Sequence, residues 1–89
     1  MMSIIRIPVP LRKLVGGSEE INTFGQTVEA ALIMLCLSYP ELKDRIFDEE
    51  ENIRKFLNIY LNDEDIRFLE STDLKEGDVI SIVPALAGG

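Results

Sequence analysis

Five stretches of the chain show the pattern of a β-strand, with apolar residues at alternate positions or in a short β-branched run. They are residues 3–10, 19–24, 54–61, 66–69 and 79–83. The third is the most regular, because Leu57, Ile59 and Leu61 alternate with more polar neighbours. In the first, Pro8 and Pro10 cannot donate ladder hydrogen bonds, so we expect the second half of that strand to be poorly paired.

One stretch has the period of an α-helix. Its apolar stripe runs at helical spacing through Val28, Ala31, Leu32, Leu35, Cys36 and Tyr39. Thr27 precedes the stripe and is a good N-cap, because its hydroxyl can accept a free backbone N–H of the first turn. Pro40 should end the helix. We expect residues 40–47 to form a second, shorter helix, with Leu42, Ile46 and Phe47 turned inward.

Two features lie outside the expected core. Ile33, Met34 and Leu37 fall off the helical stripe, so they are either covered by the following segment or mark a contact surface. Residues 48–51 are four consecutive acids, which indicate a solvated loop or, alternatively, a docking point for a basic partner. Calcium binding is disfavoured, because no glycine or spaced set of oxygen ligands accompanies the acids.

The order of these elements predicts the α+β class and a β-grasp (ubiquitin-like) architecture. We expect one mixed sheet of about five strands, with the main helix packed on one face. The first and last strands should lie side by side in the middle and run parallel. The domain is expected to span residues 1–84, followed by a flexible tail at residues 85–89.

Composition narrows the functional classes. The chain has 89 residues and a net charge of -7, which disfavours binding to a nucleic-acid backbone. It has no histidine, so His-based catalytic triads and His-containing metal sites are excluded. Its longest apolar run, residues 30–37, is far shorter than the roughly 20 residues that cross a membrane. Without a signal-peptide pattern or a cysteine pair, we expect a cytoplasmic protein that other proteins act on, not an enzyme, with no cofactor of its own.

The last five residues are the strongest chemical signal. They read Ala85, Leu86, Ala87, Gly88 and Gly89 and follow directly from an expected central strand. Terminal glycines have no Cβ, so such a tail can thread a narrow channel in another enzyme. The carboxylate of Gly89 would then be sterically open to activation with ATP.

The chain resembles the ubiquitin-like β-grasp sulfur carriers over essentially its whole length. The most specific stretches are residues 56–68 and the ending at residues 82–89. Further matching motifs are Ile7-Pro8, Leu11-Arg12, Gly16-Gly17 and residues 25–28. Within the family it is most similar to the carrier of cysteine biosynthesis and to relatives described as the small subunit of molybdopterin synthase.

The resemblance implies a mechanism centred on Gly89. An ATP-dependent activating enzyme related to E1 would adenylate its carboxylate, and sulfur transfer would convert it to a thiocarboxylate. The sulfur would pass to a pyridoxal-phosphate-dependent cysteine synthase-like enzyme, with a zinc metalloprotease releasing the product, or to the large subunit of molybdopterin synthase. ATP, pyridoxal phosphate and zinc would belong to these partners. A protein modifier joined to lysines through Gly89, and an interaction module with an idle tail, remain alternatives.

Partner contacts are expected on the sheet face away from the helix, near the start of the tail. The candidates are Phe68, Val83 and Leu86, with Arg67 beside them. Arg67 could equally pair with a nearby acid. Cys36 lies on the helical stripe, so it is expected to be a small buried hydrophobe and not the sulfur-bearing residue.

Overall fold

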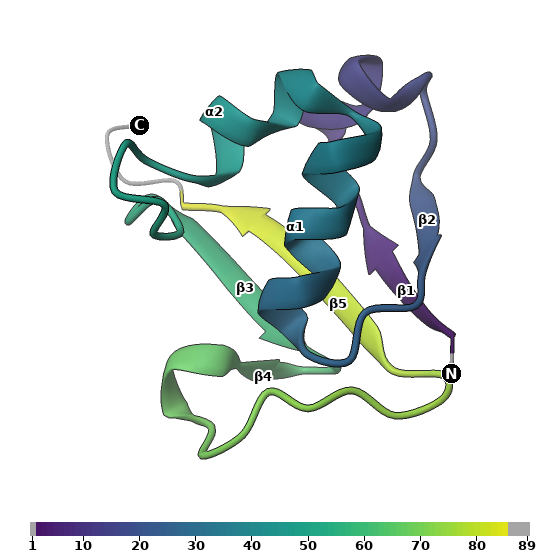
Figure 1. The fold of residues 1–89 in the computed structure, drawn as a ribbon, viewed down its shortest axis with the longest axis vertical. Coiled ribbons are helices and arrows are strands. Elements are labelled where there is room, and N and C mark those ends of the chain that lie inside the picture. The colour runs from purple at the N-terminus through teal and green to yellow at the C-terminus, as the bar shows by residue number, and fades with distance from the viewer. Residues whose placement is uncertain (1, 86–89) are drawn as a thin grey trace.

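The structure is a computed structural model, and it describes residues 2–85 (Figure 1). Its helices and strands follow in chain order, and short 3₁₀ helices are marked η. They are β1 (Ser3–Arg6), η1 (Val9–Val15), β2 (Glu20–Thr23), α1 (Val28–Ser38), η2 (Pro40–Leu42), α2 (Lys43–Ile46), β3 (Leu57–Leu61), β4 (Glu64–Asp65), η3 (Ile66–Phe68) and β5 (Val79–Pro84).

The last strand, β5, lies at the centre of the sheet. The strand order is β2-β1-β5-β3-β4. β5 pairs parallel with β1, in a register that places Ile5 beside Ile80, and antiparallel with β3, where Ile59 faces Ile82. α1 crosses one face of this sheet (Figure 1). The predicted β-grasp architecture is confirmed, including the parallel pair of first and last strands.

α1 begins where the sequence predicts. Thr27 is its N-cap, and the hydroxyl of Thr27 accepts a hydrogen bond of 3.1 Å from the backbone N–H of Ala30. Just upstream, a Cβ on Gly25 would lie 2.6 Å from the backbone nitrogen of Ala31, so only glycine lets the chain pass this close to the helix. The helix buries Val28, Ala31, Leu32 and Leu35 against the sheet.

The sheet side of the core comes from alternate residues of its strands. The buried ones are Ile5 on β1, Leu57, Ile59 and Leu61 on β3, and Ile80 and Ile82 on β5. Leu42, Ile46 and Phe47 close one end of the core and are also buried, which confirms the prediction that they turn inward. At about 25 cal/mol per Å² of buried apolar surface, this cluster supplies most of the driving force for folding.

The prediction of a strand through Pro10 is wrong. β1 ends at Arg6, and residues 9–15 form η1 instead. The two prolines are the cause, because neither can donate to a ladder and both fit a helical turn: the N–H of Leu11 donates to the carbonyl of Pro8 at 2.9 Å. Val9, which would continue the alternation of Ile5 and Ile7 if the strand went on, is exposed as a result.

The predicted strand at residues 66–69 is also wrong. The return strand is β4, only Glu64–Asp65, and the chain then turns into η3. The carboxylate of Asp65 causes this turn, because it accepts a hydrogen bond of 2.9 Å from the backbone N–H of Arg67. The preceding strand is shorter than predicted as well, since β3 begins at Leu57 and not at Arg54.

Candidate functional site: the base of the tail and the open sheet face

The chain leaves the sheet from its central strand. β5 ends at Pro84, and the next residue still continues the ladder, because the N–H of Ala85 donates to the carbonyl of Phe56 at 2.6 Å. The predicted sulfur attachment site Gly89 and the tail residues Gly88, Ala87 and Leu86 lie outside the described residues. The described part of the chain therefore ends at Ala85, beside the start of β3.

The sheet face opposite α1 is open, and Val83 lies on it. Ile80 and Ile82 are buried under the helix, so Ser81 and Val83 face the other way, as the sequence predicts. Val83 is 41% exposed. Its partner on β3 is Asn58. Residues directly opposite on antiparallel strands share a face, so Asn58 belongs to the same surface as Val83.

Arg67 is tied to this surface through two partners. Its Nη2 lies 2.6 Å from Oδ2 of Asp65 and 3.1 Å from Oδ1 of Asn58, and its Nε donates to Oδ1 of Asp65 at 3.1 Å. The side-chain hydrogen bonds from Arg67 lower the pKa of Asp65, and the same contacts raise the pKa of Arg67. The alternative that Arg67 pairs with a nearby acid is therefore correct. The pairing also holds the guanidinium in one orientation beside Asn58.

Phe68 is the exposed aromatic residue beside Arg67. Its side chain is 84% exposed, and the guanidinium carbon of Arg67 lies 6.0 Å from its ring centroid. Of the four predicted contact residues, Val83 and Arg67 both adjoin Asn58, Phe68 lies beside Arg67, and Leu86 lies outside the described residues. Sequence reasoning missed Asn58, although the alternation of β3 had already placed it opposite to the buried Leu57 and Ile59.

The remaining candidate, Cys36, does not have the properties of a reactive thiol. It is partly buried and packs against the hydrophobic core. Burial raises the pKa of its thiol, and this outweighs the attraction of Lys43, which acts in the opposite direction. The thiol is therefore protonated at neutral pH, and its role is to fill space.

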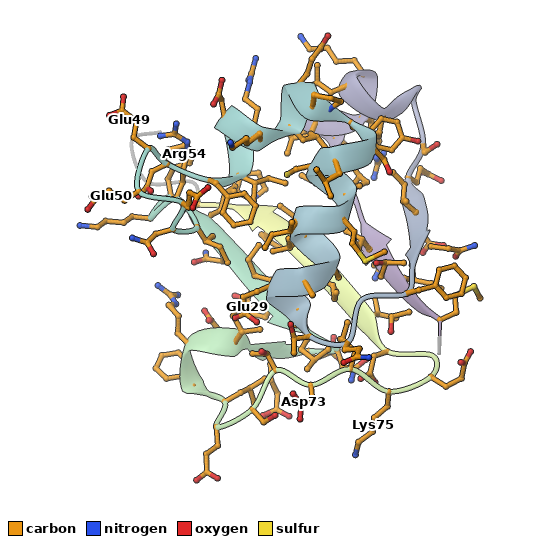
Figure 2. All side chains as sticks on the ribbon, in the orientation of Figure 1. Glu29, Glu49, Glu50, Arg54, Asp73 and Lys75 are labelled. Atoms are coloured by element: carbon orange, nitrogen blue, oxygen red, sulfur yellow. The ribbon has the colours of Figure 1, made fainter. Side chains whose placement is uncertain are left out.

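The acid run at residues 48–51 is an ordered turn. Oδ1 of Asp48 accepts the backbone N–H groups of Glu50 at 2.9 Å and Asn52 at 3.0 Å. Glu49 and Glu50 extend away from the fold, near Arg54 (Figure 2). Among residues 2–85, no three acidic or sulfur side chains are grouped so that they could hold a metal ion. In the same part of the chain, no helix has the length and apolar character needed to cross a membrane.

A mixed five-stranded sheet with its C-terminal strand at the centre and one helix across a single face defines the β-grasp class of ubiquitin-like proteins. The protein-family model described as "ThiS family" matches residues 5–89, so the chain belongs to this family. The match includes the described domain and the Gly-Gly ending.

Three relatives illustrate the family. The sulfur carrier protein CysO of Mycobacterium tuberculosis is 36% identical over 89 residues, which cover 96% of each chain. A chain in the crystal structure of the BexX/CysO complex of Amycolatopsis orientalis is 35% identical, with a TM-score of 0.85, covering 98% of this chain and 99% of that one. Small archaeal modifier protein 1 of Methanosarcina acetivorans is 32% identical, with a TM-score of 0.83 and coverage of 99% and 96%. These are named as carriers and modifiers and not as enzymes, in agreement with the prediction for this chain.

Proposed function

We propose that this chain is a sulfur carrier protein whose terminal carboxylate, on Gly89, carries the sulfur as a thiocarboxylate for cysteine biosynthesis. The observation that carries the proposal is that the ThiS family match extends to Gly89 itself. The 36% identity to a sulfur carrier, over almost the whole of both chains, supports it.

The proposed chemistry proceeds in two steps on the Gly89 carboxylate. A carboxylate is a poor electrophile, so one of its oxygens first attacks the α-phosphorus of ATP, and pyrophosphate leaves. The resulting acyl-adenylate carries a good leaving group. Hydrosulfide (HS⁻) then attacks the acyl carbon and displaces AMP, which leaves with the bonding electron pair, and loss of the S–H proton gives the thiocarboxylate. All of this takes place in partner enzymes, and the chain contributes an unhindered carbonyl carbon.

The open sheet face is proposed to orient the tail in those partners. Val83 and Phe68 offer apolar contact area, and Arg67 offers a charge held in place by Asp65 and Asn58. Exposed aromatic and arginine side chains are the kind that dominate binding energy at interfaces. The proposed partners are an E1-like activating enzyme, a pyridoxal-phosphate enzyme that accepts the sulfur, and a zinc metalloprotease that releases the product.

The test is the mass of the C-terminal tryptic peptide, residues 76–89, after incubation with ATP, a sulfide source and the activating enzyme. Replacement of oxygen by sulfur adds about 16 Da at the carboxyl terminus. Methionine oxidation adds nearly the same mass, but residues 76–89 contain neither methionine nor cysteine. A variant lacking Gly89 is the matched control and should show no shift. No shift in the intact chain, with an enzyme that modifies its own carrier, would refute the proposal.

Protein modification is the second candidate function. It is favoured by the 32% identity to a small archaeal modifier protein. In that case Gly89 would form an isopeptide bond with a lysine of another protein. Trypsin leaves a Gly-Gly remnant on such a lysine only where an arginine or lysine directly precedes the two glycines. Residues 76–89 contain neither arginine nor lysine, so trypsin would leave a longer branch. Branched peptides carrying residues 76–89, without any thiocarboxylate, would favour modification.

A further inference from the structure

The outer face of α1 carries apolar side chains that the proposed function does not use. Ile33 and Leu37 are one helical turn apart, and their side chains are 51% and 76% exposed. The buried stripe of the helix, from Val28 to Leu35, faces the sheet instead. Figure 1 shows that within the described part of the chain no other element crosses this outer face.

These side chains border a hollow between α1 and the segment that follows α2. The hollow has a volume of about 380 Å³. Its lining residues are Ile33, Cys36, Leu37, Lys43, Phe47 and Glu51. We call this hollow with its lining the helix groove. Its floor is mostly apolar, and one cation and one acid stand at its rim.

The rim is continuous with the acid run. Glu51 belongs both to the groove and to residues 48–51, while Glu49 and Glu50 extend outward beside it (Figure 2). Glu51 has a left-handed backbone, with φ of 65°, which is uncommon for a residue other than glycine. The three glutamates line a second hollow with Asp44, Asp48, Lys43 and Arg54, so five acids and two bases are grouped there, and Glu51 and Lys43 belong to both hollows.

We infer that the helix groove binds a basic amphipathic helix of a partner protein. Apolar side chains at i and i+4 of that helix would enter the groove beside Leu37, as in other helix-in-groove complexes. Lysine or arginine side chains on its flank would meet Glu49, Glu50 and Glu51. The two sequence features left open, the off-stripe apolar residues and the acid run, then form one surface.

Charge selects this occupant over two others. A second copy of the chain would bring another net charge of -7 and another acid run against the groove. An anionic membrane surface would be repelled for the same reason. A basic helix is attracted by the excess of acids around residues 48–51, and its apolar residues match the floor of the groove.

The helix groove and the open sheet face lie on opposite sides of the sheet. α1 covers one side, while Val83 and Asn58 lie on the other. A partner in the groove would therefore leave Val83 and Asn58 accessible. The inference is independent of the chemistry at Gly89, and the failure of either proposal would leave the other standing.

The test uses a fluorescein-labelled peptide of about 18 leucine and lysine residues in an amphipathic helical pattern, long enough to be helical. Its binding to the intact chain is followed by fluorescence anisotropy. We expect the double variant I33S/L37S to raise Kd about tenfold, because it removes the apolar anchors. The variant E49Q/E50Q should raise Kd by about threefold at low salt and have little effect at high salt. Thermal melts of each variant check that the fold is intact.

The matched control is F24S, which removes an apolar side chain that is 64% exposed, beside β2 and away from the groove. It should leave Kd unchanged, and a peptide with glutamate in place of lysine should not bind. Equal weakening by F24S and I33S/L37S, or equal binding of the glutamate peptide, would overturn the inference. So would a sedimentation result in which the chain dimerises through Leu37, or binding of anionic vesicles that depends on it.

Discussion

The arginine on the open sheet face is held by partners that lie on a different strand and on its own turn. Asp65 supplies two oxygens to Arg67, and Asn58 supplies a third contact from β3. An arginine that is already oriented loses less conformational freedom when a partner binds. In this ion pair the side chain of Arg67 is exposed to solvent, so we expect the pair to contribute to recognition more than to stability.

The first prediction is that D65N weakens binding to the activating enzyme by about tenfold, the effect of roughly 1.4 kcal/mol. Asparagine keeps the size of the side chain but removes the charge that holds Arg67. The control is E64Q, which neutralises the neighbouring acid of β4 and should leave binding nearly unchanged. Titration calorimetry gives the two Kd values. Equal Kd values for D65N and the unchanged chain would contradict the prediction that the oriented Arg67 contributes to this interface.

The second prediction concerns pH. Arg67 lowers the pKa of Asp65, so the folded state binds a proton at this site less readily than the unfolded chain does. The stabilising contact is therefore fully present above the ordinary aspartate pKa of about 3.9, and it is lost as the pH falls through the depressed value. A carboxyl carbon titration by NMR should give a midpoint for Asp65 below that value. The R67A variant should move the midpoint upward, and an unchanged midpoint would contradict the assignment.

At the scale of elements, regular apolar spacing predicted most of the strands and the main helix correctly, but it did not predict where proline or a polar contact ends a strand. Leu57, Ile59 and Leu61 predict β3 because alternate burial is a property of the strand itself. The end of β1 was missed, because Pro8 and Pro10 remove ladder donors while the alternation continues past them. Strand-like spacing in residues 66–69 was likewise overruled by a single carboxylate that closes a turn. Periodicity reports on burial, and short polar contacts decide where an element stops.

The third prediction tests the N-cap of α1. Replacing Thr27 by alanine removes the acceptor for the N–H of Ala30 and should lower the free energy of unfolding by about 1 kcal/mol. Serine at the same position keeps the hydroxyl and should restore most of the loss. Urea denaturation of both variants measures the difference. If T27A and T27S were equally stable, the loss would not come from the cap.

At the scale of the whole molecule, the proposed function divides the chain into a folded domain and an ending that carries the chemistry. Within residues 2–85, the buried core lies between residues 5 and 82. The pattern of the sequence predicted the β-grasp fold, whereas the chemical role of the Gly-Gly ending is what the resemblance to the sulfur carriers implies and stays a prediction. It could not show that Asn58 joins Val83 to Arg67, because that link depends on the pairing of β3 with β5 and on the turn at Asp65.

The fourth prediction follows from this separation. Deleting Gly88 and Gly89 should abolish sulfur transfer and change the melting temperature by less than about 2 °C, since the buried core of residues 2–85 lies between residues 5 and 82. Activity is measured by the mass shift of the C-terminal peptide and stability by thermal melting. A large fall in melting temperature would mean that the ending is part of the folded structure.

The central position of β5 has a mechanical consequence. A partner that draws on the end of the chain pulls β5 along its own axis, between β1 on one side and β3 on the other. Such a force loads the hydrogen bonds of both ladders together, in shear, and does not open them one after another as it would at a hairpin end. A force applied at the end of β5 would therefore be shared by two ladders, and the folded domain should resist unravelling under it.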